Sequence, residues 1–355
     1  MFAGGTVDVS VHEKNLDGTL KELHRASGGP WGGTCVDKSY IDWLTQMFGM
    51  ETIERLKRES MGDYVDMLRE FENKKRSIAP DTKGLITLRV SAALKEYHDE
   101  SDEENIVSKI ARMNLKEEIK FQRDKLRVSA DIARKWFHYP IDMTIRHITG
   151  ILAEPEMKDV RTVLLVGGFA ECKLVQEAVR KAVIKRTVIV PDEAGLTVLK
   201  GAVRFGHQPN LVSSRRVKHT YGYRVYSNFD ASKHSQEMMV IDTYGTKVVD
   251  NCFEKVVEKD TSVEVGKDIA SSQEYRLSKH GDTTLTIYAS TDHNPQYVTE
   301  PSCTKVGWLS LGEAPSEKAE ENGIQVCFAF GDTELKAKVK ILKTGKVMTK
   351  IVDCL

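Results

Sequence analysis

Residues 163–171 read VLLVGGFAE, and this stretch decides how the surrounding sequence is interpreted. Its first four residues are apolar, as in a buried strand, and Gly167-Gly168 end that strand just before a helical pattern that starts at Cys172. Turns of this kind lie at the carboxyl ends of strands, where α/β sheets bind ligands. The stretch contains no GxGxxG, so it does not support a dinucleotide site of the Rossmann type.

On both sides of this stretch, residues 1–206 alternate between strand and helix patterns, which predicts an α/β domain. The acidic run 98–104 is interpreted as a solvated loop. We expect a hairpin turn at Asp17-Gly18 and a long helix that Ser129 caps and Pro140 bends. Strands are expected at 6–12, 18–26, 85–90, 162–166 and 187–190, and helices at 37–59, 63–78, 129–153, 172–184 and 192–205.

The character of the sequence changes after Gly206. Residues 207–218 contain proline, asparagine, serine and the basic run Arg215-Arg216-Val217-Lys218, which together indicate a linker. From Tyr221 onward, short runs such as TTLTIYAS, IQVCFAF and KAKVKIL are rich in β-branched residues and are separated by glycine-containing turns. Residues 219–355 are therefore predicted to form an all-β sandwich.

Composition narrows the possible partners and the compartment. The 355 residues carry 52 Lys and Arg against 52 Asp and Glu, so net charge gives no attraction to nucleic acid or to an anionic membrane. No apolar run reaches the length of a membrane span. The six cysteines are scattered and form no CxxC, which argues against a zinc site or a disulfide framework. These features indicate a reducing compartment, the cytosol or the nucleus.

Three further segments could carry chemistry, and each also has a plain structural interpretation. The run Ala3-Gly4-Gly5-Thr6 could bind phosphate through its backbone N–H groups, or it could be a tight turn. The run GGPWGGT at 28–34 precedes a helix, which suits either anion binding or loop flexibility. Glu72, Lys75 and Arg76 share one helix face, where they form either a surface ion pair or a contact face for purine and ribose.

The order of these segments resolves them. GGTVDVS, GGPWGG, ExxKR, LLVGGFAE and PDEAGLTVLKGA follow one another as in the ATPase domain of the seventy-kilodalton heat-shock chaperones. The sequences KELHRASGGPWGGTCVD, FENKKRS and GLTVLKGAV resemble those of a divergent branch of that family. The resemblance continues through FEKVVEKDTSVEVGK and FGDTELKAKVK, at the place of the family's substrate-binding β-domain. It therefore covers essentially the whole chain and implies an actin-like, ribonuclease-H-like fold.

The resemblance also implies a set of site residues for ATP or ADP with magnesium. Asp8 matches an acidic position near the family's cation site, although no metal ligand is assigned. The residues carried over are Gly4, Gly5 and Thr6 of the second phosphate loop, Gly32 and Gly33 near the phosphates, Glu72, Lys75 and Arg76 on the adenosine helix, Gly167 and Gly168 of the adenosine loop, and Asp192 at the start of the last helix.

The sequence departs from the family pattern in several places. The phosphate loop's leading aspartate would fall at Met1, and Ala3 stands where the family has a glycine. Phe169 and Glu171 occupy positions where ordinary members carry a small hydroxyl residue and an adenine-stacking arginine. The family's first phosphate loop, interdomain linker and helical lid have no counterpart. We therefore expect a fragment that begins within the ATPase domain, with lobe II and a remnant of lobe I.

Two functions remain open at this level. One is an ATP-binding, chaperone-like protein with weak or no hydrolysis, which recognises client proteins or peptides through the β-domain. The other is an interaction module that works without nucleotide. The sequence supports neither a nucleic-acid partner nor a membrane partner.

Overall fold

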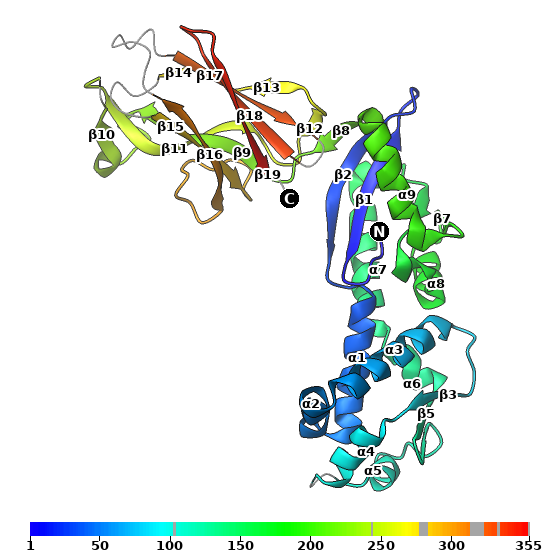
Figure 1. Ribbon diagram of the computed structural model, residues 1–355. Coiled ribbons are helices and arrows are strands. Elements are labelled where there is room, and N and C mark those ends of the chain that lie inside the picture. The colour runs from blue at the N-terminus through cyan, green and yellow to red at the C-terminus, as the bar shows by residue number, and fades with distance from the viewer. Residues whose placement is uncertain (102–103, 243, 277–282, 313–322, 332–333, 354–355) are drawn as a thin grey trace. The chain divides into compact units, whose positions relative to one another are not determined.

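A computed structural model describes residues 1–101, 104–242, 244–276, 283–312, 323–331 and 334–353 (Figure 1). The chain divides into two compact units. Unit 1 comprises Met1–Val9 and Ala26–Arg204, and unit 2 comprises Ser10–Arg25 and Phe205–Leu355. The long hairpin of strands β1 (Val7–Lys14) and β2 (Leu20–Gly29) runs through both, and its turn has the left-handed glycine expected at Asp17-Gly18, with φ +87° at Gly18.

Unit 1 is mainly helical. Its hydrophobic core includes a stack of Tyr40 on Phe71, with ring centroids 3.9 Å apart, and the edge of Trp136. The helices of the described part are α1 (Gly33–Phe48), α2 (Met50–Glu59), α3 (Met61–Ser77), α4 (Ala92–Asp99), α5 (Ile106–Arg112), α6 (Ala130–Lys135), α7 (His138–Leu152), α8 (Lys173–Ala182) and α9 (Ala194–His207).

Two predicted helices are interrupted. The helix expected at 37–59 starts earlier, at Gly33, and breaks at Gly49, whose φ of +91° does not suit a helix. Ser129 caps α6 as predicted, because its hydroxyl accepts from the N–H of Ile132. The interruption expected at Pro140 comes one turn earlier, between α6 and α7 at Trp136-Phe137. A proline ring clashes with the carbonyl four residues before it, so the break falls there, and Pro140 itself lies in the first turn of α7, where a missing N–H costs nothing.

Unit 1 also contains small sheets. Strands β3 (Leu85–Arg89), β4 (Ile119–Gln122) and β5 (Lys125–Ser129) form one in the order β3-β5-β4. Strands β6 (Thr162–Leu164) and β7 (Thr187–Ile189) pair in parallel. The loop predicted at 98–104 is wrong for its first two residues, since His98 and Asp99 end α4, and residues 102–103 lie outside the described part.

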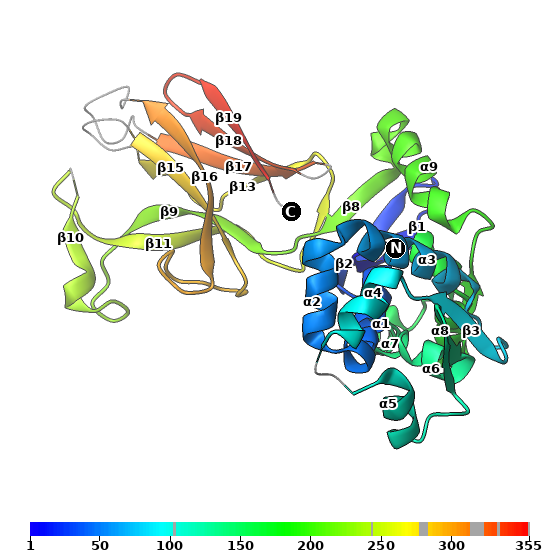
Figure 2. The same cartoon turned by 60° about the horizontal axis from the view of Figure 1, so that its bottom comes forward.

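Two antiparallel sheets form most of unit 2. One has the order β10-β11-β9-β15-β16, and the other has the order β13-β17-β18-β19 with β14 beside β17. Figure 2 shows β17, β18 and β19 as neighbours, and both sheets contribute to one buried cluster. The strands are β9 (Thr220–Asn228), β10 (Met239–Ile241), β11 (Lys247–Val257), β13 (Asp268–Ala270), β14 (Tyr275–Arg276), β15 (Thr283–Ser290), β16 (Cys303–Gly312), β17 (Gly323–Phe330), β18 (Glu334–Ile341) and β19 (Val347–Asp353).

Residues 207–218, expected as a linker, contain a strand. β8 (Val212–Arg216) pairs in parallel with β2, with Leu20 opposite Val212, and antiparallel with β12 (Ser262–Glu264). The basic run was interpreted as part of that linker, but backbone pairing on both sides of β8 fixes this segment within unit 2. No helix in the described part has the length and apolar character needed to cross a bilayer.

Candidate functional site

The turn at Ala3–Thr6 packs against the start of α1. The N–H groups of Gly32, Gly33 and Thr34 donate to the carbonyls of Gly5, Ala3 and Gly4, at 3.3, 3.3 and 2.8 Å. A side chain at position 32 would bring its Cβ within 2.4 Å of the Gly4 carbonyl oxygen, so this approach requires glycine. The first N–H groups of α1, predicted to face phosphate, are thus occupied by protein carbonyls.

The loop Val166-Gly167-Gly168, which we call the VGG loop, contacts the same N-terminal segment. Phe2 donates its N–H to the carbonyl of Val166 at 2.6 Å and accepts from the N–H of Phe169 at 3.0 Å. Gly167 has φ +99°, and a Cβ there would stand 2.3 Å from the Phe2 carbonyl oxygen, so this position also requires glycine. Gly167 donates to the carbonyl of Ala194 and thereby ties the loop to α9.

Lys75 is the charged residue at which these elements converge. Its side chain is buried at the end of α3, and its Nζ lies 2.7 Å from Asp37 Oδ1 and 2.5 Å from Glu72 Oε2. The same Nζ donates to the carbonyl of Gly33 at 3.4 Å. A Cβ built on Gly33 would be 3.7 Å from Lys75 Nζ and 3.6 Å from the Phe169 ring. Helix α3, the start of α1 and the VGG loop therefore meet here.

Glu72 and Arg76 form the outer part of this face. Arg76 Nε donates to Glu72 Oε1 at 2.9 Å, and the Arg76 side chain is 72% exposed, which leaves its guanidinium open to a ligand. Partial burial acts to raise the pKa of the Glu72 carboxyl, but hydrogen bonds from Lys75 and Arg76 outweigh it and hold that pKa below its ordinary value. Glu72 is therefore ionised at neutral pH.

The Gly4-Gly5 turn keeps some donors free. The N–H groups of Gly4 and Gly5 have no acceptor in the part of the chain that is described, and a Cβ on either residue would meet nothing within 4 Å. The Thr6 hydroxyl donates to Asp8 Oδ2 at 3.0 Å. This turn has room for an anion on its outer side, whereas Gly32 and Gly33 do not present free N–H groups.

Gly168 and Asp192 lie at the edge of this arrangement. Gly168 starts a short 3-10 helix (Gly168–Glu171), and Glu171 accepts from the N–H of Gly195 at 3.0 Å. Asp192 is exposed and lines a separate cavity of about 430 Å³ with Glu171, Lys173, Gln176 and Arg180. Among the described residues, no other predicted site residue lines that cavity.

Asp37 is a site residue that the sequence did not reveal. It was used only to mark the start of a helix, whereas its carboxylate holds Lys75. Its position four residues after Gly33 places it on the inward side of the first turns of α1, and this spacing is the signal that could have identified it.

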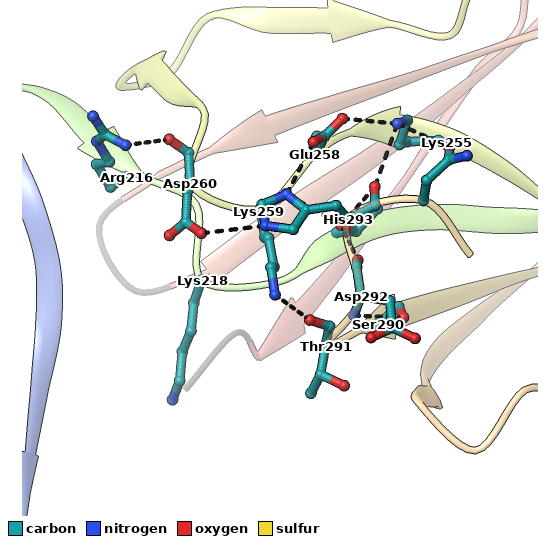
Figure 3. Close-up of polar contacts among 12 residues, drawn as sticks. Arg216, Lys218, Lys255, Glu258, Lys259, Asp260, Ser290, Thr291, Asp292 and His293 are labelled. Atoms are coloured by element: carbon teal, nitrogen blue, oxygen red, sulfur yellow. Dashed lines mark hydrogen bonds and ion pairs between the residues drawn. The ribbon is translucent and has the colours of Figure 1, made fainter.

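Unit 2 has a second group of charged residues, which ties two turns together (Figure 3). His293 Nδ1 lies 2.9 Å from Glu258 Oε1, and Lys255 Nζ lies 2.8 Å from Glu258 Oε2. Arg216 donates to the carbonyl of Asp260 at 2.8 Å. Hydrogen bonds from Lys255 and His293 lower the pKa of the Glu258 carboxyl. These side chains are solvated ion pairs, which contribute little to stability individually.

Known proteins are similar in sequence to this chain over nearly its full length. The chain is 33% identical to heat shock 70 kDa protein 12A of Mus musculus and 31% identical to heat shock 70 kDa protein 12B of Homo sapiens, each over 99% of this chain and 53% of the relative. It is 26% identical to heat shock 70 kDa protein 6, chloroplastic, of Arabidopsis thaliana over 58% of this chain and 25% of the relative. No protein-family model matches the chain.

These similarities define the class first. The chain belongs to the seventy-kilodalton heat-shock protein family, and the relatives imply an actin-like ATPase fold, which agrees with the mixed helices and sheets of the structure. Within the family, it belongs to the heat shock 70 kDa protein 12 branch. The chain spans about half the length of the curated relatives that it matches.

Proposed function

We propose that this chain is an ATP-binding, chaperone-like protein of the heat shock 70 kDa protein 12 type. Its nucleotide binds where Glu72, Lys75 and Arg76 of α3 meet the start of α1 and the VGG loop, a surface that we call the Lys75 face. One observation supports this best: the buried Nζ of Lys75 lies within hydrogen-bond reach of both Asp37 and the carbonyl of Gly33. Helix α3, the start of α1 and the VGG loop are thereby brought to one place, and these are the segments that the resemblance assigns to adenosine and phosphate.

The adenosine side has the more complete set of groups. Exposed Arg76 can lie against a purine, and ionised Glu72 can accept hydrogen bonds from ribose hydroxyls. Gly167 and Gly168 let the backbone approach a base without a side chain between them. The buried ring of Phe169 supplies an apolar surface beside Gly33.

The phosphate side has fewer groups. Its free donors are the N–H groups of Gly4 and Gly5. The Lys75 ammonium is already paired with two carboxylates, so little of its positive charge is left for a phosphate. The described residues contain no group of three His, Cys, Asp or Glu side chains that could hold a metal, so magnesium would arrive with the nucleotide and meet at most Asp8. Nucleotide affinity should therefore be weak, roughly −4 to −6 kcal/mol.

The same shortage limits hydrolysis. Phosphoryl transfer depends on preorganised cations and N–H donors around the transferring group, and removing one such donor commonly lowers the rate by about 100-fold or more. We therefore propose weak or no ATP hydrolysis. We also propose that the sheets of unit 2 form a β-sandwich at residues 219–355 that takes the place of the family's client-binding domain.

A second candidate function is an interaction module that works without nucleotide. It draws support from the N–H groups of Gly32 and Gly33, which donate to protein carbonyls and not to solvent. In that case the glycine-rich turns serve only to pack the N-terminal segment.

Amide hydrogen exchange with and without ATP distinguishes the two functions. An ATP concentration of about 10 mM is used, since it is about ten times the weakest expected dissociation constant. Nucleotide binding predicts slower exchange at residues 2–6, 72–76 and 166–171 than in the free protein. Unchanged exchange in all three segments would favour the module that needs no nucleotide.

A further inference from the structure

A second polar surface lies on another side of α3. A groove of about 1250 Å³ is enclosed by α3, the end of β3, the start of α4 and the β4–β5 turn. Figure 1 shows these elements in the same region of unit 1. The N–H of Val90 donates to the carbonyl of Asp124 at 2.8 Å, and this bond fixes the β4–β5 turn against the end of β3. Met67 and Val90 are buried at its base.

Both walls of the groove carry mixed charges, with acidic residues more numerous on α3 and basic residues more numerous opposite. The α3 wall carries Asp63, Asp66 and Glu70 with Arg69 and Lys74, and the opposite wall carries Arg89, Lys95 and Arg123 with Asp124. On α3, Asp66 is paired with Arg69, and one oxygen of Glu70 accepts from the N–H of Arg89 at 3.3 Å.

The basic side chains of the opposite wall are not neutralised. Arg89, Lys95 and Arg123 have no ion pair in the described part of the chain, and neither does Lys74, which reaches the groove from α3. Arg123 has a φ of +58° because it is the first central residue of the two-residue turn between Gln122 and Lys125, and turns of this length require a positive φ there.

We propose that this groove binds an acidic peptide segment, which lies along Arg89, Lys95 and Arg123 and away from the carboxylates of α3. The four unpaired cations come from α3, β3, α4 and the β4–β5 turn, so they suit several side chains spread along a segment better than one small anion. This site is distinct from the Lys75 face, although both use α3, because Lys74 lines the groove and Lys75 does not.

The test is fluorescence anisotropy of the full chain with a labelled peptide of eight glutamates. Octaglutamate should bind more tightly than octalysine, and its affinity should fall as salt rises because exposed charges are screened. Arg89→Ala and Arg123→Ala should each weaken binding by about two- to fivefold, which is the usual effect of one exposed charge pair. Arg58→Ala is the matched control, since Arg58 is exposed, pairs with Glu59 and lies outside the groove.

A variant that is expected to bind octaglutamate more tightly provides a second test, because misfolding would not increase the affinity. Asp63→Asn deletes a repelling carboxylate from the α3 wall and should strengthen octaglutamate binding by about two- to fivefold. ATP added at constant ionic strength should not displace the peptide, so failure of the nucleotide proposal would leave this one intact. The proposal is overturned if Arg58→Ala weakens binding as much as Arg123→Ala, if Asp63→Asn has no effect, or if inorganic phosphate at constant ionic strength displaces the peptide.

Discussion

Lys75 Nζ and Asp37 Oδ1 are 2.7 Å apart, and this contact links the end of α3 to the first turns of α1. The lysine side chain is only 10% exposed, whereas the aspartate is 31% exposed. The pair therefore holds a cation within unit 1 while one of its oxygen partners still reaches solvent. It fixes the geometry of the proposed nucleotide face and has a consequence for stability.

Replacing the lysine should destabilise the protein. Lys75→Met leaves Asp37 and Glu72 without their shared cation, and we expect a loss of about 1–3 kcal/mol in the free energy of unfolding, less than for a fully buried pair because both carboxylates are partly solvated. Guanidinium titration measures this loss. Lys181→Met is the control, because its pair with Glu177 is exposed on α8 and should contribute less than about 0.5 kcal/mol.

Gly167 of the VGG loop and Gly150 of helix α7 give a matched pair of glycine substitutions. Gly167→Ala places a Cβ 2.3 Å from the Phe2 carbonyl oxygen at a φ of +99°, so we expect a loss of roughly 2 kcal/mol or more. Gly150→Ala meets nothing within 4 Å inside helix α7 and should raise stability by about 0.5–1 kcal/mol. Equal melting temperatures for the two variants would contradict the packing described for the VGG loop.

The acid limb of stability should depend on Glu72. Its folded-state pKa is lowered, so the carboxylate stabilises the fold above its unfolded value of 4.5, and this contribution is lost as pH falls through the folded pKa. Thermal melts from about pH 7 to pH 3 should show that wild type is more stable than Glu72→Gln at neutral pH and that this difference shrinks as the solution is acidified. A difference that stays constant across this range would argue against the ion pairs of Glu72 with Lys75 and Arg76.

Hydrolysis of ATP should be indistinguishable from background in a phosphate-release assay with the purified chain. The reason is that Lys75 is doubly paired and that, among the residues the structure describes, the free donors on the phosphate side are the N–H groups of the Gly4-Gly5 turn. The sharpest challenge to this expectation is a magnesium-dependent turnover that disappears in Thr6→Ala.

The sequence predicted more of the fold than of the site. Local signals located the hairpin turn at Gly18, the cap at Ser129 and most helices, because these features depend on nearby residues. It missed β8, since a polar and basic segment gains its strand conformation only by pairing with β2, about 190 residues away in the chain. It also missed Asp37 and the occupation of Gly32 and Gly33 by the Ala3–Gly5 carbonyls, because contacts between distant turns leave no local pattern.

The central claim is that adenine nucleotide binds at the Lys75 face mainly through its adenosine part. Calorimetric titration with adenosine, ADP and ATP tests it most directly, with Arg76→Ala alongside the wild type. We predict dissociation constants from high micromolar to millimolar, or roughly −4 to −6 kcal/mol, similar for the three ligands and weakened about equally by Arg76→Ala. Binding of ATP at least about 100-fold tighter than adenosine, a difference of about 2.8 kcal/mol, or no binding of any of the three, would contradict the claim.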